Sequence, residues 1–126
     1  MKNSGDSFVR GRIRSLKFAF KGAWLLLTTE DSIKAQVIMA IMITVLGCFF
    51  NISNIEWMLQ FLVIGMVLVA ESLNTAVEKI ADFVHPDYHE KIGFIKDIAA
   101  GAPTFAGITS LIVAGFIYFP KINLLF

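Results

Sequence analysis

Apolar residues first recur along the chain with helical periodicity, between residues 8 and 27. They form one stripe of a predicted helix, made up of Ile13, Leu16, Phe20, Trp24 and Leu27. A basic stripe runs beside it, made up of Arg10, Arg14, Lys17 and Lys21. Such a helix is typical of a segment that lies in the headgroup layer, with its rings buried and its cations reaching towards lipid phosphates. The pattern therefore predicts a membrane-surface helix over residues 8–27.

Three later segments are almost continuously apolar instead of periodic. They are residues 35–50, 57–82 and 98–119. Runs of this kind are long enough to cross a hydrocarbon core about 30 Å thick. A mixed-charge connection at 83–97 precedes the last span, with Pro86 expected to end one helix before the next begins and Pro103 expected to kink the next one near its start. The pattern predicts an all-α membrane protein, a single domain over 1–126 with one surface helix followed by three transmembrane helices.

Composition agrees with this prediction and adds an orientation. Of 126 residues, 56% are hydrophobic and the mean hydropathy is +0.71, unlike an ordinary soluble domain. The lone Cys48 excludes a disulfide within the chain. Basic residues flank the spans unevenly, with none between 51 and 56. The amino-terminal segment and the 83–97 connection carry Lys2, Arg10, Arg12, Arg14, Lys17, Lys21, Lys91 and Lys96. The positive-inside rule then places the amino terminus and the 83–97 connection in the cytoplasm.

The second predicted span ends in a stretch that contains several acids, although the end of a membrane span is an unfavourable place for charge. Its polar side chains are spaced three, four and four residues apart and share one helix face: Glu71, Asn74, Glu78 and Asp82. Ionised groups near a bilayer interior cost free energy unless they are paired or bind a cation, so carboxylates in register predict a functional site. The predicted topology brings three further charged residues to the same membrane surface: Glu30, Lys96 and Asp97.

By themselves these side chains predict a membrane protein with an acidic cytoplasmic site, and phosphoryl transfer is one reaction that could use them. The reaction needs a divalent metal to neutralise a triphosphate, a cation to hold the transferring group and an acceptor for the proton of the attacking hydroxyl. Magnesium prefers one or two carboxylates plus phosphate oxygens, which Glu30 and Glu78 could supply, and Lys96 could hold phosphates. Glu71 lies deepest of the acids, so it is placed to meet the hydroxyl of a lipid whose tails remain in the bilayer.

Several polar features also have other interpretations. The acidic face could belong to a polar-cored small transporter, a proton-conducting oligomer or a purely structural membrane subunit. Glu30 could instead cap the helix that follows it. His85 and His89 lack acids at the spacing of a zinc site, so a solvated loop is expected there. Glu56 and Gln60, at the opposite membrane surface, are expected to be interfacial or packing groups. The basic stripe would also suit nucleic acid, but a membrane domain follows at once, so no nucleic-acid partner is expected.

Residues 71–82 read Glu-x-Leu-Asn-Thr-Ala-Val-Glu-x-x-x-Asp. The pattern continues with Tyr88-His89, then with Lys96-Asp97 followed by Ala-Ala-Gly-Ala at 99–102; upstream, Lys21-Gly22 stands nine residues before Glu30. On these residues the chain resembles the small prokaryotic integral-membrane diacylglycerol kinases, a family that includes the undecaprenol kinases. The resemblance extends from about Phe8 to Tyr118.

The resemblance implies a lipid kinase of the bacterial inner (cytoplasmic) membrane, multi-pass and with its amino terminus in the cytoplasm. It would use ATP and Mg²⁺ to convert diacylglycerol to phosphatidic acid, or undecaprenol to undecaprenyl phosphate, and the choice of lipid stays open. Glu71 would be the general base, with Glu30 and Glu78 as metal ligands. The residues that hold nucleotide or orient the site would be Asn74, Asp82, Lys96 and Asp97. Homotrimers with active sites between protomers are also implied.

Overall fold

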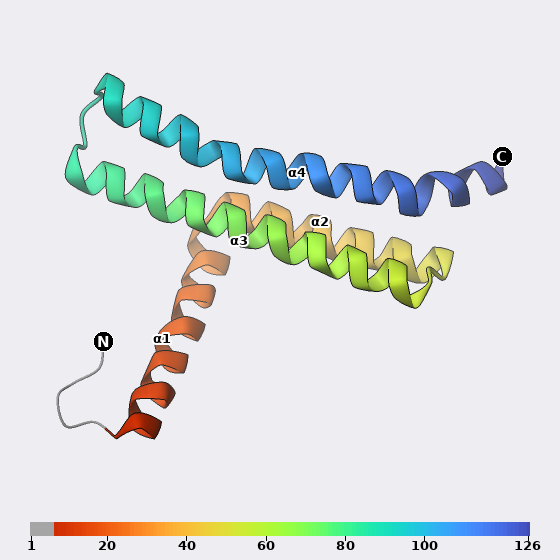
Figure 1. Ribbon diagram of the computed structural model, residues 1–126, viewed down its shortest axis with the longest axis horizontal. Helices are drawn as coiled ribbons and strands as arrows, with labels where there is room; N and C mark the ends of the chain where they lie inside the picture. Colours follow the sequence, from red (N-terminus) through yellow and green to blue (C-terminus); the bar gives the residue numbers. More distant parts are fainter. Residues whose placement is uncertain (1–6) are drawn as a thin grey trace.

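Residues 7–126 of the computed structural model form four helices joined by short turns (Figure 1). The helices are α1 (Phe8–Thr29), α2 (Asp31–Phe50), α3 (Asn54–Val84) and α4 (Glu90–Leu125). Helices α2, α3 and α4 lie alongside one another, whereas α1 projects away from them at its junction with α2 (Figure 1). By length and composition, α2, α3 and α4 can each cross a membrane. The predicted all-α class, with one helix preceding three membrane spans, is confirmed. Residues 1–6, which include Lys2 of the predicted cytoplasmic charges, lie outside the described residues.

Local hydrogen bonds explain where two of the helices begin. The Ser7 hydroxyl accepts a hydrogen bond of 3.2 Å from the backbone N–H of Arg10, which caps α1. At the start of α3, Ser53 and Glu56 form a capping box, in which each side chain accepts a bond from the other residue's backbone N–H. Between α2 and α3 the chain turns at Asn51, whose φ of 51° is left-handed, a conformation that asparagine tolerates better than most residues. The turn between α2 and α3 is therefore encoded locally.

The start of α4 differs from the prediction in a way that matters for the site. The helix begins at Glu90 rather than at residue 98, and the His89 side chain caps it by accepting a bond of 3.0 Å from a first-turn N–H. Hydropathy marks only the part of a helix that suits hydrocarbon, so the charged first turns were assigned to a connection. As a result, Lys96 and Asp97 are held on a helix and not in a loop. Pro103 lies inside α4, and the kink expected there stays a prediction.

Few side chains of the single chain are buried, and they are spread along the bundle instead of forming one continuous core. The largest buried cluster, formed by Ile52, Ile117 and Tyr118, lies beside the turn between α2 and α3. Along the rest of the spans large apolar side chains face outwards, and Phe105, for example, is 75% exposed. Lipid tails are as apolar as leucine, so a side chain that faces a bilayer loses nothing by lying outside the protein. The apolar cluster is therefore small and lies far from the acidic stretch, where Asn74, Thr75 and Ala81 are buried separately.

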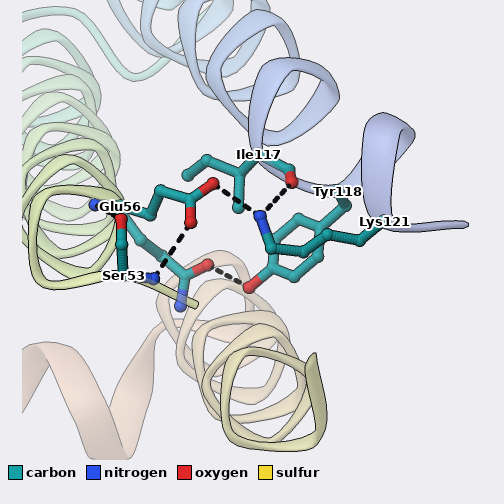
Figure 2. Close-up of polar contacts among 6 residues, drawn as sticks. Ser53, Glu56, Ile117, Tyr118 and Lys121 are labelled. Carbon is teal, nitrogen blue, oxygen red and sulfur yellow. Dashed lines mark hydrogen bonds and ion pairs between the residues drawn. The ribbon is translucent and has the colours of Figure 1, made fainter. Parts of the chain in front are cut away.

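Polar side chains of α3 and α4 interlock at the end that holds this cluster, in a group that we call the distal clasp: Glu56, Gln60, Tyr118 and Lys121 (Figure 2). The Lys121 ammonium donates to Glu56 Oε2 at 2.7 Å and to the carbonyl of Ile117 at 3.0 Å. The other oxygen of Glu56 accepts from Ser53 N–H at 2.9 Å. Both the carboxylate and its cation are thus satisfied within the chain.

The second half of the distal clasp also includes α2. The Tyr118 hydroxyl donates to Gln60 Oε1, and the Gln60 amide donates to the carbonyl of Ile43 on α2 at 3.3 Å. Helix α2 can approach this closely because it has no side chain at Gly47, where an added Cβ would lie 2.8 Å from the Trp57 ring and 3.1 Å from the Tyr118 hydroxyl. All three membrane helices are joined at this point. The expectation that Glu56 and Gln60 are packing groups is confirmed.

Candidate active site

Four side chains of α3 form what we call the acidic row: Glu71, Asn74, Glu78 and Asp82. The row runs from partly buried positions to an exposed one. Glu71 and Glu78 are partly buried, Asn74 is only 7% exposed, and the Asp82 side chain is 61% exposed. All four stand on one uninterrupted helix, so the periodicity that placed them on one face holds in the structure. Within residues 7–126, Glu71 has no hydrogen bond or ion pair. A carboxylate held partly buried on an apolar span without a partner is available to a ligand or substrate.

Asn74 and Glu78 interact one helical turn apart. The Asn74 amide donates to Glu78 Oε1 at 3.2 Å, but the buried Asn74 Oδ1 has no hydrogen-bond partner among the described residues. Buried amide oxygens are nearly always paired, because leaving one unpaired costs about 1–3 kcal/mol. An orphaned acceptor beside a carboxylate indicates that a donor or a cation completes this part of the site.

Glu30 lies at the break between α1 and α2 and reaches α3. It occupies the amino-terminal cap position of α2, but its side chain makes no capping hydrogen bond, so capping does not account for the carboxylate. Its Oε1 atom lies 3.1 Å from the ammonium of Lys79, and the Glu30 side chain is 20% exposed. The structure therefore brings Glu30 to the residue that directly follows Glu78. Sequence reasoning missed Lys79, although it is the single basic residue of the 71–82 stretch.

Helix α4 contributes a second ion pair to the exposed end of the row. Lys96 Nζ lies 2.6 Å from Asp82 Oδ1, so the two residues that were expected to hold nucleotide are in direct contact. The neighbouring Asp97 is exposed and has no partner within the described part of the chain. The predicted set is therefore only partly assembled. Asn74 contacts Glu78 and Asp82 contacts Lys96, whereas Glu71 and Asp97 stand apart.

The described residues do not form a complete metal site by themselves. Within 7–126, no group of three or more acidic, histidine or cysteine side chains is arranged to hold a metal ion. Two carboxylates and an amide oxygen nevertheless have the chemistry that Mg²⁺ prefers, since it commonly takes one or two carboxylates and fills its other positions with phosphate oxygens and water. Glu30, Glu78 and the orphaned Asn74 Oδ1 therefore fit magnesium bound together with a nucleotide better than magnesium alone.

An apolar groove runs from the level of the site towards the distal clasp. It has a volume of about 410 Å³, lies between α2, α3 and α4, and is lined mainly by aliphatic side chains. One lining residue, Leu68, precedes Glu71 by one helical turn, and another, Gln60, belongs to the distal clasp. The groove thus ends about one helical turn from Glu71, which does not line it, and extends from there into the apolar interior of the bundle.

Helix α1 carries the two faces that its sequence predicts. Its large apolar side chains are exposed, with Phe8, Phe20 and Trp24 at 74%, 75% and 67%. On the basic face, Arg10, Arg14 and Lys17 surround a small hollow beside Ile13. A helix with an apolar stripe, a basic stripe beside it and a position apart from the bundle is typical of one that lies in a membrane surface.

Comparison with known proteins identifies the family of the chain. The family model described as prokaryotic diacylglycerol kinase matches residues 17–118. An undecaprenol kinase from Bacillus subtilis is 33% identical over 109 residues, which are 86% of this chain and 89% of the relative. A diacylglycerol kinase from Escherichia coli is 27% identical over 115 residues, covering 89% of this chain and 91% of the relative. The resemblance seen in the sequence motifs is confirmed, and the chain belongs to the prokaryotic diacylglycerol kinase family.

Proposed function

We propose that this protein transfers the γ-phosphoryl group of ATP to the hydroxyl of a membrane lipid alcohol, at the cytoplasmic surface of the bacterial inner membrane. Family membership makes it a lipid kinase, and its three apolar helices make it a multi-pass membrane protein. One observation carries the rest of the proposal. The row on α3 runs from the sheltered Glu71, beside an apolar groove, to the exposed Asp82–Lys96 pair at the helix end. Such a face can meet a lipid hydroxyl at one end and a soluble nucleotide at the other.

In this proposal the role of each polar residue follows from its distance to the exposed end of α3. Glu71 accepts the proton of the lipid hydroxyl because, among the acids at 71–82, it is the one that follows the groove-lining Leu68 most closely along α3. Lys96 and Asp82 at the exposed end, with Asn74 and Asp97, hold the nucleotide and orient the site. Glu30 and Glu78 hold Mg²⁺, and Asn74 Oδ1 is placed to bond to the metal–nucleotide group. The metal ion, when bound, neutralises charge on the triphosphate.

The proposal includes assembly as a homotrimer with active sites between protomers, as the family resemblance implies. Its support within the chain is twofold. The described residues supply fewer ligands than a metal site needs. In addition, α3 and α4 carry glycines with open space beside them, because a Cβ added at Gly65 or Gly107 would meet no atom within 4 Å. Small residues on an exposed membrane face let helices of other protomers approach closely.

Lipid-dependent ATP consumption is the experiment that tests the proposed reaction. Purified protein in mixed micelles is expected to release ADP only when a lipid alcohol is present, which neither a transporter nor a structural subunit would do. The higher identity to the Bacillus relative favours undecaprenol over diacylglycerol. We therefore expect kcat/KM to be at least roughly tenfold higher for undecaprenol, a difference of about 1.4 kcal/mol in transition-state stabilisation. A preference for diacylglycerol would reverse the lipid assignment. If neither lipid caused ADP release, the kinase assignment would be contradicted.

The orientation is tested by cysteine labelling. In a Cys48→Ala background, Asn54→Cys, at the exposed first residue of α3, should react with an impermeant thiol reagent added to intact spheroplasts. Tyr88→Cys, at a position 84% exposed in the turn between α3 and α4, should react only after the membrane is opened. The asymmetry of basic residues motivates this expectation. The reverse labelling pattern would place the acidic row on the side of the membrane that lacks ATP.

A further inference from the structure

Lys79 connects the acidic stretch of α3 to the junction of α1 and α2. Its ammonium lies 3.1 Å from Glu30 Oε1. Within the described part of the chain, no other hydrogen bond or ion pair joins residues 28–50 to residues 71–82. Helix α1 otherwise projects away from the bundle (Figure 1). The placement of the Glu30 carboxylate beside α3 therefore depends on Lys79 more than on any other polar contact.

The geometry of the pair leaves half of the Glu30 carboxylate available. Lys79 contacts Oε1, and the Thr29 hydroxyl, which also lies near Oε1 at 3.4 Å, directs its proton to the carbonyl of Leu25 at 2.6 Å. Oε2 of Glu30 has no partner among the described residues. A carboxylate held through one oxygen by a neighbouring donor is oriented for ligation through the other, as ligands of metal sites commonly are.

Lys79 follows Glu78 directly on the same helix, so the lysine that contacts Glu30 brings that carboxylate to the turn of α3 that carries Glu78. Neither the motif of the acidic row nor its spacing includes this lysine. Its ammonium would repel a metal ion if it acted only through its charge. A useful role must therefore come from the orientation that it imposes on Glu30.

We propose that Lys79 is a positioning residue, which holds Glu30 Oε1 so that Oε2 faces the metal position beside Glu78. This inference rests on the proposed function, in which Glu30 and Glu78 hold the metal. Lys79 itself contacts neither metal nor substrate. Its contribution is limited in size because its side chain is 69% exposed and exposed ion pairs are weak.

Direct measurement of Mn²⁺ binding tests the proposal without any turnover. Free Mn²⁺ is followed by electron paramagnetic resonance as the metal alone is titrated into the protein in micelles. Lys79→Met is expected to weaken Mn²⁺ binding roughly fivefold, about the limit for an exposed ion pair. Lys79→Arg, which keeps a donor to Glu30, should stay within twofold of the parent protein. Simple electrostatics gives the opposite sign, because removal of a positive charge attracts a cation, so tighter or unchanged binding in Lys79→Met overturns the proposal.

Two further variants separate this inference from the function on which it rests. Lys34→Met removes the same charge one helical turn from Glu30, but Lys34 pairs with Asp31 at 3.7 Å, so Mn²⁺ affinity should not fall. Glu30→Gln should weaken Mn²⁺ binding by itself, and adding Lys79→Met to it should cause no further loss. If Glu30→Gln has no effect, Glu30 is not a ligand and the proposed metal site fails. If Glu30→Gln weakens binding and Lys79→Met does not, only the role of Lys79 is wrong.

Discussion

Glu71→Gln is expected to abolish phosphoryl transfer while leaving the affinity for the metal–nucleotide complex within twofold. A positioned general base typically contributes 10²–10⁴-fold to the rate, so kcat should fall by about three orders of magnitude. Nucleotide binding should survive because Glu71 lies about two helical turns, roughly 10 Å, from Glu78 along α3. Glutamine keeps the size of the side chain and removes only the basic oxygen. Steady-state kinetics with a lipid alcohol, together with calorimetric titration of a non-hydrolysable ATP analogue, would measure the two effects separately.

The chain offers a matched control for this substitution. Glu56→Gln makes the same chemical change on the same helix, but in the distal clasp, where the carboxylate pairs with Lys121. It should reduce thermal stability and leave kcat close to that of the parent protein. The role assigned to Glu71 would be wrong if Glu71→Gln lost nucleotide as severely as a change at Glu78. Glu71 would then belong with the metal ligands, and the proton acceptor would have to be another group.

Glu78→Gln is expected to weaken both nucleotide binding and turnover. Glutamine retains an oxygen that can accept the bond from the Asn74 amide, so the local helix should be preserved while the charge is lost. Without that charge the metal position loses one of its two carboxylates, and kcat/KM should fall by roughly 10²–10³-fold at fixed magnesium, about 3–4 kcal/mol of transition-state stabilisation. Turnover as a function of magnesium, with circular dichroism to confirm folding, would check this expectation. Near-normal turnover at saturating magnesium would remove Glu78 from the metal site.

Sequence patterns predicted the helices well because hydropathy and helical periodicity report directly on them. The ends of the helices were predicted less well, because a charged turn beyond the hydrocarbon is helical without being apolar. This is why Lys96 and Asp97 were placed in a connection, although they stand on α4. The pairing of Lys96 with Asp82 then follows from the antiparallel packing of α3 and α4, which a pattern within one helix does not describe.

The contacts between helices were the least predictable part of the structure. Glu56 and Gln60 were recognised as packing groups, but their partners Tyr118 and Lys121 lie on α4, far along the chain. Lys79 was overlooked for a similar reason. A single lysine among acids is typical of a solvated helix end, and nothing in the local spacing links it to Glu30. The roles of the individual acids stay predictions, because two of them, Glu71 and Asp97, lack partners within the described residues.

The join between Gly47, Gln60 and Tyr118 constrains how this sequence can diverge. A side chain at position 47 would strike the Trp57 ring and the tyrosine hydroxyl, and loss of that hydroxyl would remove a partner from an amide that is 3% exposed within an apolar helix. An unpaired buried amide is costly, so single replacements at these positions should be selected against. Exchange of the glutamine and the tyrosine together for apolar residues removes both polar groups and avoids that cost. We therefore expect homologues to carry either the whole polar set or none of it, a correlated substitution pattern at the end of the molecule farthest from the chemistry.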